Sequence, residues 1–257
     1  MTEQPPNIES ERHKPIPVFS EESHPLLFKI RCIFDLQLKT IVDFLKPELR
    51  LMKDNVLDIG TGQSPWTGYL NSDVKFVGLD TAEAEKFNMS KNKDVVYYNG
   101  ENFPFANSQF ANALCIEVLE HVPNTDLFLS ETARVLKPGG QLLLTVPWSA
   151  RRHHIPHDYY RFTKEGLKAL LDRHGFVNIQ IHERGNDITT AYNKILILVA
   201  NLFRNTSLAS FVFSIFLACV LLSALFWLFV AAHASLLFKA KLSTDPLGYS
   251  VKAEKAR

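Results

Sequence analysis

Short apolar runs alternate with segments of helical periodicity through the middle of the chain. This pattern is typical of βαβ units that build a parallel sheet. It predicts strands at residues 56–59, 74–79, 95–98, 113–116 and 142–146, and helices at residues 65–70, 82–89, 125–136 and 163–174. We expect Asn124 to begin the third of these helices, the sequence 138–140 to end it, and Gly175 to end the fourth. Val177, Ile179 and Ile181 then alternate with polar residues as in a half-buried strand, and a similar alternation returns at residues 247–253.

The N-terminal part divides into a polar arm and a helix. Residues 1–24 contain several prolines and few apolar side chains, so we expect a flexible arm. Across residues 26–45, apolar residues recur at steps of three or four, which predicts one helix, and we expect Pro47 to end it.

A long apolar segment interrupts the alternation before the last predicted strand. Residues 188–244 contain no Asp or Glu, and no charged residue lies between Arg204 and Lys239. Residues 208–238 exceed the roughly 20 apolar residues with which a helix crosses a bilayer core. We therefore predict that the chain divides into a folded domain at 25–187 plus 245–257 and a hydrophobic insertion at 188–244, which contacts membrane lipid through residues 195–238.

Composition limits the partners. Lys and Arg number 28 and Asp and Glu 27, so the net charge of +1 produces no field that attracts nucleic acid. Cys32, Cys115 and Cys219 are far apart and form no CxxC pair, which argues against a disulfide framework and a zinc site. The N-terminus lacks the basic start and apolar stretch of a secretory signal, so we expect the folded domain in the cytoplasm.

The most informative motif is the glycine turn after the first predicted strand, in the sequence VLDIGTGQSPW. Gly60 and Gly62 permit a sharp turn and a close ligand approach, and amides at the start of a following helix can bind a carboxylate or a phosphate. Asp80 ends the second predicted strand, where a carboxylate can bind both ribose hydroxyls of an adenosine. Taken alone, the glycines can be a simple tight turn and Asp80 a helix cap. A dinucleotide fingerprint is disfavoured because Pro65 occupies the position of its third small residue.

Further motifs follow in order: VGLD, NGENFPF, EVLEHV, ARVLKPGGQLLLTVP and HDYYRFTKEGLKALLDRHGF. Together with the glycine turn they resemble the class I S-adenosylmethionine (SAM) dependent methyltransferases of the type 11 kind. More narrowly, they are similar to bacterial members associated with polysaccharide and lipopolysaccharide biosynthesis. The resemblance covers roughly residues 54–185 and the last strand. It implies an α/β, Rossmann-like, seven-stranded sheet with one antiparallel strand, and SAM bound across the carboxyl ends of the first strands.

The resemblance also assigns cofactor contacts. Asp58, Gly60 and Gly62 correspond to the turn at the methionine side, Asp80 to the ribose ligand, and Glu117 to a residue near the methionine part. The adenine side is assigned to Asn99, Gly100 and Glu101, with Phe103 and Phe105 enclosing the ring. Asn99 and Ala111 depart from the family, which usually has Asp at both positions. Glu120 and His121 fall at the edge where donor and acceptor meet, and either contact them or hydrogen-bond to residues that do.

The segment RRHHIPHDYYRF follows the fifth predicted strand and offers candidates for acid–base chemistry. Methyl transfer from a sulfonium is a direct displacement that depends on alignment, and we expect no metal. An oxygen acceptor also needs a base. We predict His154 or His157 as that base, with Asp158 orienting an imidazole and Tyr160 and Arg161 shaping the pocket. Alternatively, Asp158, Tyr160 and Arg161 form a structural cluster that caps the next helix.

The resemblance implies that the last strand pairs antiparallel with residues 177–181, so both ends of the apolar insertion return to the same side. A helix over residues 208–238 would be about 46 Å long, more than one crossing needs, which favours a re-entrant or in-plane hairpin. Basic residues bracket the segment and suit an anionic cytoplasmic leaflet: Lys194, Arg204, Lys239 and Lys241. We expect the protein at the cytoplasmic side of the cell (inner) membrane. A single transmembrane span and a soluble dimerisation helix pair are the alternatives.

These features predict a membrane-associated SAM-dependent methyltransferase that acts on a small-molecule or lipid-linked glycan acceptor, not on nucleic acid. A non-catalytic, membrane-anchored SAM-binding module is the main alternative, because Asn99 and Ala111 depart from the family pattern. A nicotinamide-dependent oxidoreductase is a third, and Pro65 argues against it.

Overall fold

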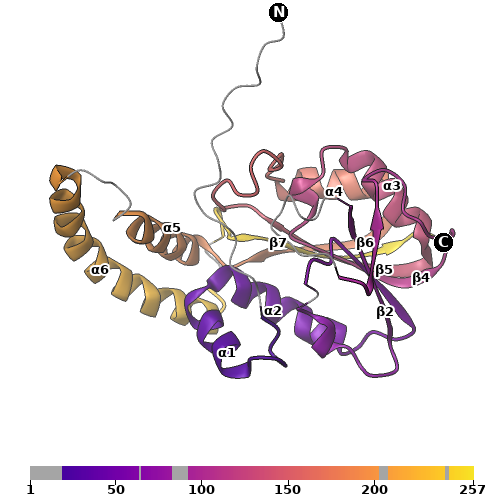
Figure 1. Cartoon of the computed structure of the whole chain (residues 1–257), viewed down its shortest axis with the longest axis horizontal. Helices are drawn as coiled ribbons and strands as arrows, with labels where there is room; N and C mark the ends of the chain where they lie inside the picture. Colours follow the sequence, from indigo (N-terminus) through magenta and orange to yellow (C-terminus); the bar gives the residue numbers. More distant parts are fainter. Residues whose placement is uncertain (1–18, 64, 83–91, 203–207, 241–242) are drawn as a thin grey trace, which may run out of the picture.

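The computed structural model describes residues 19–63, 65–82, 92–202, 208–240 and 243–257. Its centre is a seven-stranded sheet in the order β3-β2-β1-β4-β5-β7-β6. Helices α3 (Thr125–Val135) and α4 (Lys164–Arg173) cover one face, and α1 (Pro25–Phe34) and α2 (Leu36–Leu49) lie on the other (Figure 1). Each face has its own buried apolar cluster. The Rossmann-like α/β fold predicted above is thus confirmed.

The strands follow the predicted apolar runs. They are β1 (Asn55–Ile59), β2 (Lys75–Thr81), β3 (Val95–Tyr98), β4 (Phe110–Ile116), β5 (Leu136–Pro147), β6 (Phe176–Arg184) and β7 (Gly248–Lys255). Strands β1 to β5 pair in parallel. Strand β7 lies between β5 and β6 and is antiparallel to both, with Val251 opposite Leu144 and Ile181. The expected antiparallel pairing of the last strand is therefore confirmed.

Two of the predicted helices have the expected starts. The side chain of Asn124 accepts a hydrogen bond from the amide of Leu127 at the start of α3, and Thr163 does the same for Gly166 at α4. Helix α3 ends at Val135, one residue before the expected end, and residues 138–140 belong to β5 and not to a turn that ends the helix. The helix expected at residues 65–70 is only a short 3₁₀ turn, η1 (Thr67–Tyr69), and most of the helix expected at residues 82–89 lies outside the described residues.

The single helix expected over residues 26–45 is two helices, α1 and α2. Asp35 separates them, because its carboxylate accepts a hydrogen bond from the amide of Leu38 and so starts a new helix. Pro47 does not end α2, which continues to Leu49. Leu45 and Leu49 are fully buried against the sheet, and this packing offsets the one backbone hydrogen bond that a proline removes near a helix end. Most of the expected N-terminal arm lies outside the described residues.

Two apolar helices, α5 (Asp187–Asn201) and α6 (Leu208–Leu237), connect β6 to β7 and project away from the sheet side by side (Figure 1). Both ends of this α5–α6 hairpin are thus attached to strands of the same sheet, as expected. Helix α6 is continuous and does not itself bend back. The Asn186 side chain, which caps α5, donates a hydrogen bond to the hydroxyl of Ser235 on α6. Among the described residues, α6 is the one helix long and apolar enough to cross a membrane.

Candidate active site

The glycine turn after β1 needs glycine for two separate reasons. Gly60 and Gly62 have φ angles of 72° and 52°, which L-residues with side chains rarely adopt. A Cβ atom on Gly60 would also lie 2.4 Å from Cγ2 of Val118, in the loop after β4. Beneath the turn, Asp58 is 2% exposed, and its Oδ2 accepts a hydrogen bond of 2.9 Å from the hydroxyl of Thr61. The turn is therefore closely packed against the end of β4.

Asp80 links the end of β2 to this turn. Its Oδ2 accepts a hydrogen bond of 2.9 Å from the amide of Gly62, and its Oδ1 accepts one of 2.7 Å from the amide of Thr81. Burial raises the pKa of the Asp80 carboxyl above its ordinary value. Each carboxylate oxygen has a further lone pair for a ligand hydroxyl. The geometry fits the ribose ligand that the sequence predicts.

A cavity of about 680 Å³ lies over the carboxyl ends of β1, β2 and β4, within the size range of small-molecule and cofactor sites. Seven of the predicted cofactor-binding residues line it: Gly60, Gly62, Asp80, Asn99, Gly100, Glu101 and Glu117. Asp58, the remaining one, lies below the turn and positions it. The side-chain oxygen of Asn99 accepts a hydrogen bond from the amide of Glu101, which shapes this wall.

Part of the cavity wall was not found by sequence reasoning. Helices α1 and α2 and the cap residue between them contribute five lining residues, namely Arg31, Asp35, Gln37, Leu38 and Ile41. The available signal was that Arg31 and Asp35 are oppositely charged and four residues apart within a stretch of helical periodicity, and their side chains lie 3.5 Å apart. Phe103 and Phe105 do not enclose the cavity, so that expectation is wrong. Phe103 is 3% exposed in the core, and Tyr98 and Phe128, which contact it edge-on, line the cavity instead.

A buried arginine holds Glu117 at the cavity edge. Nη2 of Arg184, at the end of β6, donates a hydrogen bond of 2.7 Å to Oε1 of Glu117. The Arg184 side chain is 2% exposed and also donates to the carbonyl of Val146. Arg184 was not singled out from the sequence, because the pair joins residues 67 positions apart.

The loop after β5 supplies a second wall. His154, His157 and Tyr159 line the cavity, and Nδ1 of His157 lies 3.2 Å from the Tyr159 hydroxyl. Asp158, Tyr160 and Arg161 are not among the lining residues. Asp158 pairs with Arg161 at 2.6 Å, and Tyr160 donates a hydrogen bond to the carbonyl of Pro123.

These three residues fix the loop's shape and do not contact the cavity. The imidazole that pairs with Asp158 is that of His153, with 3.6 Å between Nδ1 and Oδ2, and not that of a candidate base as expected. The alternative expectation, a structural cluster of these residues, agrees with these contacts, but its role as a cap is wrong because Thr163 caps α4.

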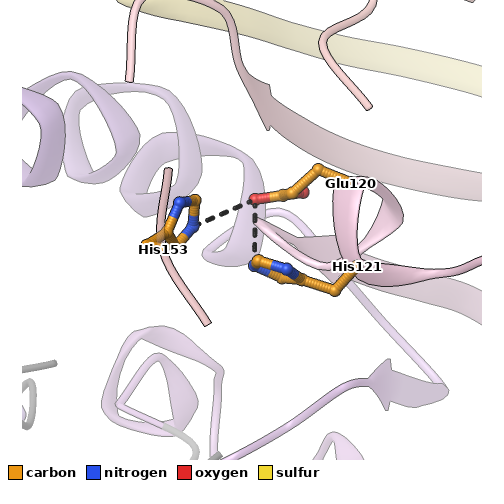
Figure 2. A group of neighbouring side chains, drawn as sticks. All are labelled: Glu120, His121 and His153. Carbon is orange, nitrogen blue, oxygen red and sulfur yellow. Dashed lines mark ion pairs between the residues drawn. The ribbon is translucent and has the colours of Figure 1, made fainter. Parts of the chain in front are cut away.

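A buried acidic group lies behind this wall. Glu120 is fully buried in η3 (Leu119–His121), and the imidazoles of His121 and His153 face its carboxylate (Figure 2). Burial raises the pKa of Glu120 well above its ordinary value and lowers the pKa of His121 to about 4. His121 lines the cavity, so this cluster is continuous with the site.

The buried carboxyl group of Asp58 should make the stability of the fold depend on pH. Burial raises its pKa from an ordinary 3.8 to about 7, although the Thr61 hydrogen bond lowers it. Because the folded protein binds this proton more tightly than the unfolded chain, stability falls as the pH rises from about 4 to about 7. We expect Asp58→Asn to remove this loss, which is at most about 4 kcal/mol, as measured by urea unfolding at several pH values. The exposed Asp73, changed to Asn, is the control, and equal pH profiles for Asp58→Asn and the wild type would refute the prediction.

Part of the sequence is similar to that of known methyltransferases. Residues 57–144 match the family model described as a methyltransferase domain. A fatty-acid O-methyltransferase of Mycolicibacterium smegmatis is 30% identical over 128 residues, which cover 46% of this chain and 45% of the relative. A ubiquinone biosynthesis O-methyltransferase of Dechloromonas aromatica is 28% identical over 116 residues, which cover 40% of this chain and 49% of the relative. The chain thus spans about half the length of the curated relatives it matches.

The fold has a counterpart among solved structures. A SAM-dependent methyltransferase from Archaeoglobus fulgidus aligns with a TM-score of 0.52 and 16% identity, covering 90% of this chain and 100% of that one. The fold and the matched segment point to one class: residues 57–144 resemble a methyltransferase domain, and the sheet has the fold of a SAM-dependent methyltransferase, a class whose cofactor is SAM.

Proposed function

We propose that the protein transfers a methyl group from SAM to a small-molecule or lipid-linked acceptor at a membrane surface. The observation that carries this proposal is one cavity with two kinds of wall. The glycine turn and Asp80 form one wall, and His154, His157 and Tyr159 form the other. A cofactor bound along the first wall would present its methyl group toward the second.

The residues of this chain bind the cofactor, align it with the acceptor and exclude water. When bound, SAM supplies an electrophilic methyl group on a sulfonium. Asp80 would bind the ribose hydroxyls, and Glu117, held by Arg184, would lie near the methionine part. Leu38, Ile41 and Phe128 are apolar lining residues that limit the access of water.

The second wall offers groups that can take a proton from an oxygen acceptor. His157 lies beside the Tyr159 hydroxyl, and His154 also lines the cavity. A neutral imidazole has one nitrogen with a lone pair, so either histidine can accept the acceptor's proton as the methyl group is transferred. We keep His154 and His157 as the candidate bases.

The membrane part of the proposal rests on the α5–α6 hairpin. Only 11% of the most apolar stretch within Phe211–Leu237 is buried, and large side chains such as Phe216 and Trp227 are 67% and 69% exposed. Placing these side chains in lipid removes apolar surface from water. Both ends of the hairpin are attached to the same sheet, so we infer that it enters the membrane from the side of the catalytic domain.

The hairpin and the cavity share a helix. Leu36 of α2 is fully buried against Tyr192 of α5 and Ala232 of α6, and the Tyr192 hydroxyl donates a hydrogen bond to the carbonyl of Phe34. The next residues of α2, Gln37 and Leu38, line the cavity. A membrane-bound hairpin would therefore place the cavity close to the lipid surface, which favours an acceptor with an apolar part.

The relatives described above are consistent with such an acceptor, since one is named for fatty acids and the other for ubiquinone biosynthesis. The narrower resemblance to polysaccharide and lipopolysaccharide enzymes stays a prediction, and with it a lipid-linked glycan as the acceptor. The cytoplasmic face of the inner membrane likewise stays our proposed location.

The test is methyl transfer by the purified protein. We expect labelled methyl groups from SAM to enter a product when a membrane lipid extract is added. His157→Ala is expected to lower turnover by about 10²–10⁴-fold, the usual contribution of a general base, with unchanged affinity for S-adenosylhomocysteine. His182→Ala, an exposed histidine on β6, is the control.

Three other results would change the proposal. Undiminished turnover in His157→Ala removes that residue as the base. Tight binding of S-adenosylhomocysteine without any labelled product supports the non-catalytic module instead. Absence of such binding contradicts the whole proposal.

A further inference from the structure

Glu120, His121 and His153 form a cluster that the mechanism above does not use (Figure 2). Nε2 of His121 lies 3.6 Å from Oε1 of Glu120, and Nε2 of His153 lies 3.9 Å from the same oxygen. The three ligand atoms lie within 4.8 Å of one another. These separations are too long for direct hydrogen bonds.

The spacing suits an ion between the three groups. Two ligand atoms bound to one tetrahedral Zn²⁺ at about 2.0–2.1 Å lie roughly 3.4 Å from each other. Small side-chain rotations would bring the observed separations of 3.6 and 3.9 Å to that value.

Both imidazoles are oriented as metal ligands usually are. Nδ1 of His121 donates to the carbonyl of His157 at 2.7 Å, and Nδ1 of His153 donates to the carbonyl of Arg151 at 3.1 Å. A carbonyl only accepts, so the hydrogen is on Nδ1 and the neutral ring directs an Nε2 lone pair toward Glu120. A backbone carbonyl that fixes the other nitrogen in this way is typical of histidines that bind metals.

The Glu120 carboxylate is suited to pairing with a cation. Glu120 is fully buried, and both of its oxygens have no hydrogen-bond partner among the described residues. A buried carboxyl group without hydrogen bonds is costly in free energy. The charge of Arg161 acts on Glu120, but the Arg161 guanidinium is paired with Asp158. Among the described residues, Arg161 therefore donates no hydrogen bond to the Glu120 carboxylate.

We propose that Glu120, His121 and His153 bind one divalent transition-metal ion, with Zn²⁺ as the representative case. Two imidazole nitrogens and one carboxylate oxygen favour such ions over Mg²⁺ and Ca²⁺, which prefer oxygen ligands. The sequence led us to expect no metal because the cysteines are far apart. The site instead forms from η3 and the loop after β5.

The ion would lie beside the proposed acceptor wall. His121 lines the cavity, and so does His154, whose ring centroid is 5.0 Å from that of His121. A metal bound there acts as a Lewis acid and lowers the pKa of an acceptor hydroxyl. This role rests on the proposed methyl transfer, whereas metal binding does not.

The test is a calorimetric titration of Zn²⁺ into chelator-treated protein without a histidine tag. We expect one ion per chain, with at least about tenfold weaker binding in Glu120→Gln and in His153→Ala. His182→Ala, an exposed histidine outside the cluster, is the matched control and should bind Zn²⁺ as the wild type does. Absence of binding to the wild type, or equal affinity in Glu120→Gln and His182→Ala, overturns the proposal.

Two further measurements keep the outcome interpretable. Glu120→Gln preserves the size of the side chain, and its affinity for S-adenosylhomocysteine reports whether the variant is folded. Zn²⁺ is expected to raise the unfolding temperature of the wild type and not of Glu120→Gln. Zn²⁺ binding without methyl transfer would support the metal site and contradict the proposed function. Methyl transfer without Zn²⁺ binding would support the proposed function and contradict the metal site.

Discussion

Replacing Gly60 with alanine is expected to lower the affinity for S-adenosylhomocysteine by about 100-fold or more and to destabilise the fold by at least about 2 kcal/mol. The φ angle of 72° costs a residue with a side chain about 1–2 kcal/mol. In addition, the new Cβ would lie 2.4 and 2.7 Å from the two γ carbons of Val118, so the turn or the loop after β4 must move. Calorimetry and urea unfolding measure the two effects.

Matched variants separate the two causes. Gly139 has a φ angle of 74°, and apart from its chain neighbours no atom of the described residues lies within 4 Å of the place that a Cβ would take. Gly139→Ala therefore measures the conformational cost alone and should leave cofactor binding unchanged. Val118→Ala combined with Gly60→Ala removes the two closest contacts, leaves the Cβ of residue 118 at 3.1 Å, and should therefore recover part of the lost affinity. Wild-type affinity in Gly60→Ala would show that the cofactor does not use this turn.

Changing Phe216, Leu222 and Trp227 on α6 together to Asp is expected to release the protein from membranes. These side chains are 67%, 53% and 69% exposed, and they lie along the apolar helix. An Asp at the centre of a membrane-inserted helix costs about 2.5–3.5 kcal/mol, so the triple variant loses at most roughly 7.5–10.5 kcal/mol of insertion free energy. Flotation with lipid vesicles measures the fraction bound.

The control is an apolar residue of equal exposure outside the hairpin. Leu51, after α2, is 73% exposed, and Leu51→Asp should leave flotation unchanged while Trp227→Asp already weakens it. If the wild type stays in solution as a dimer and the triple variant is monomeric, the apolar face is a dimer interface and the membrane proposal fails.

The strands were predictable because their signal is local. A central strand of a parallel sheet is buried on both faces, so it is a short apolar run wherever it occurs in the chain. The glycine turn and Asp80 were also found this way, since each directly follows such a run. The expectations for Pro47 and for Phe103 failed because the outcome depended on packing: α2 continues past its proline against the sheet, and Phe103 enters the core.

The sequence by itself determined the parallel sheet, the glycine turn with Asp80 at the end of the next strand, and a long apolar helix between the last two strands. Only the tertiary structure decided which distant groups meet. Strands β4 and β5 are neighbours, so the loops at their carboxyl ends bring Glu120 and His153 together, and β6 brings Arg184 to Glu117. Periodicity records which face of an element is buried, whereas these contacts depend on strand order, which is set by the packing of the whole sheet.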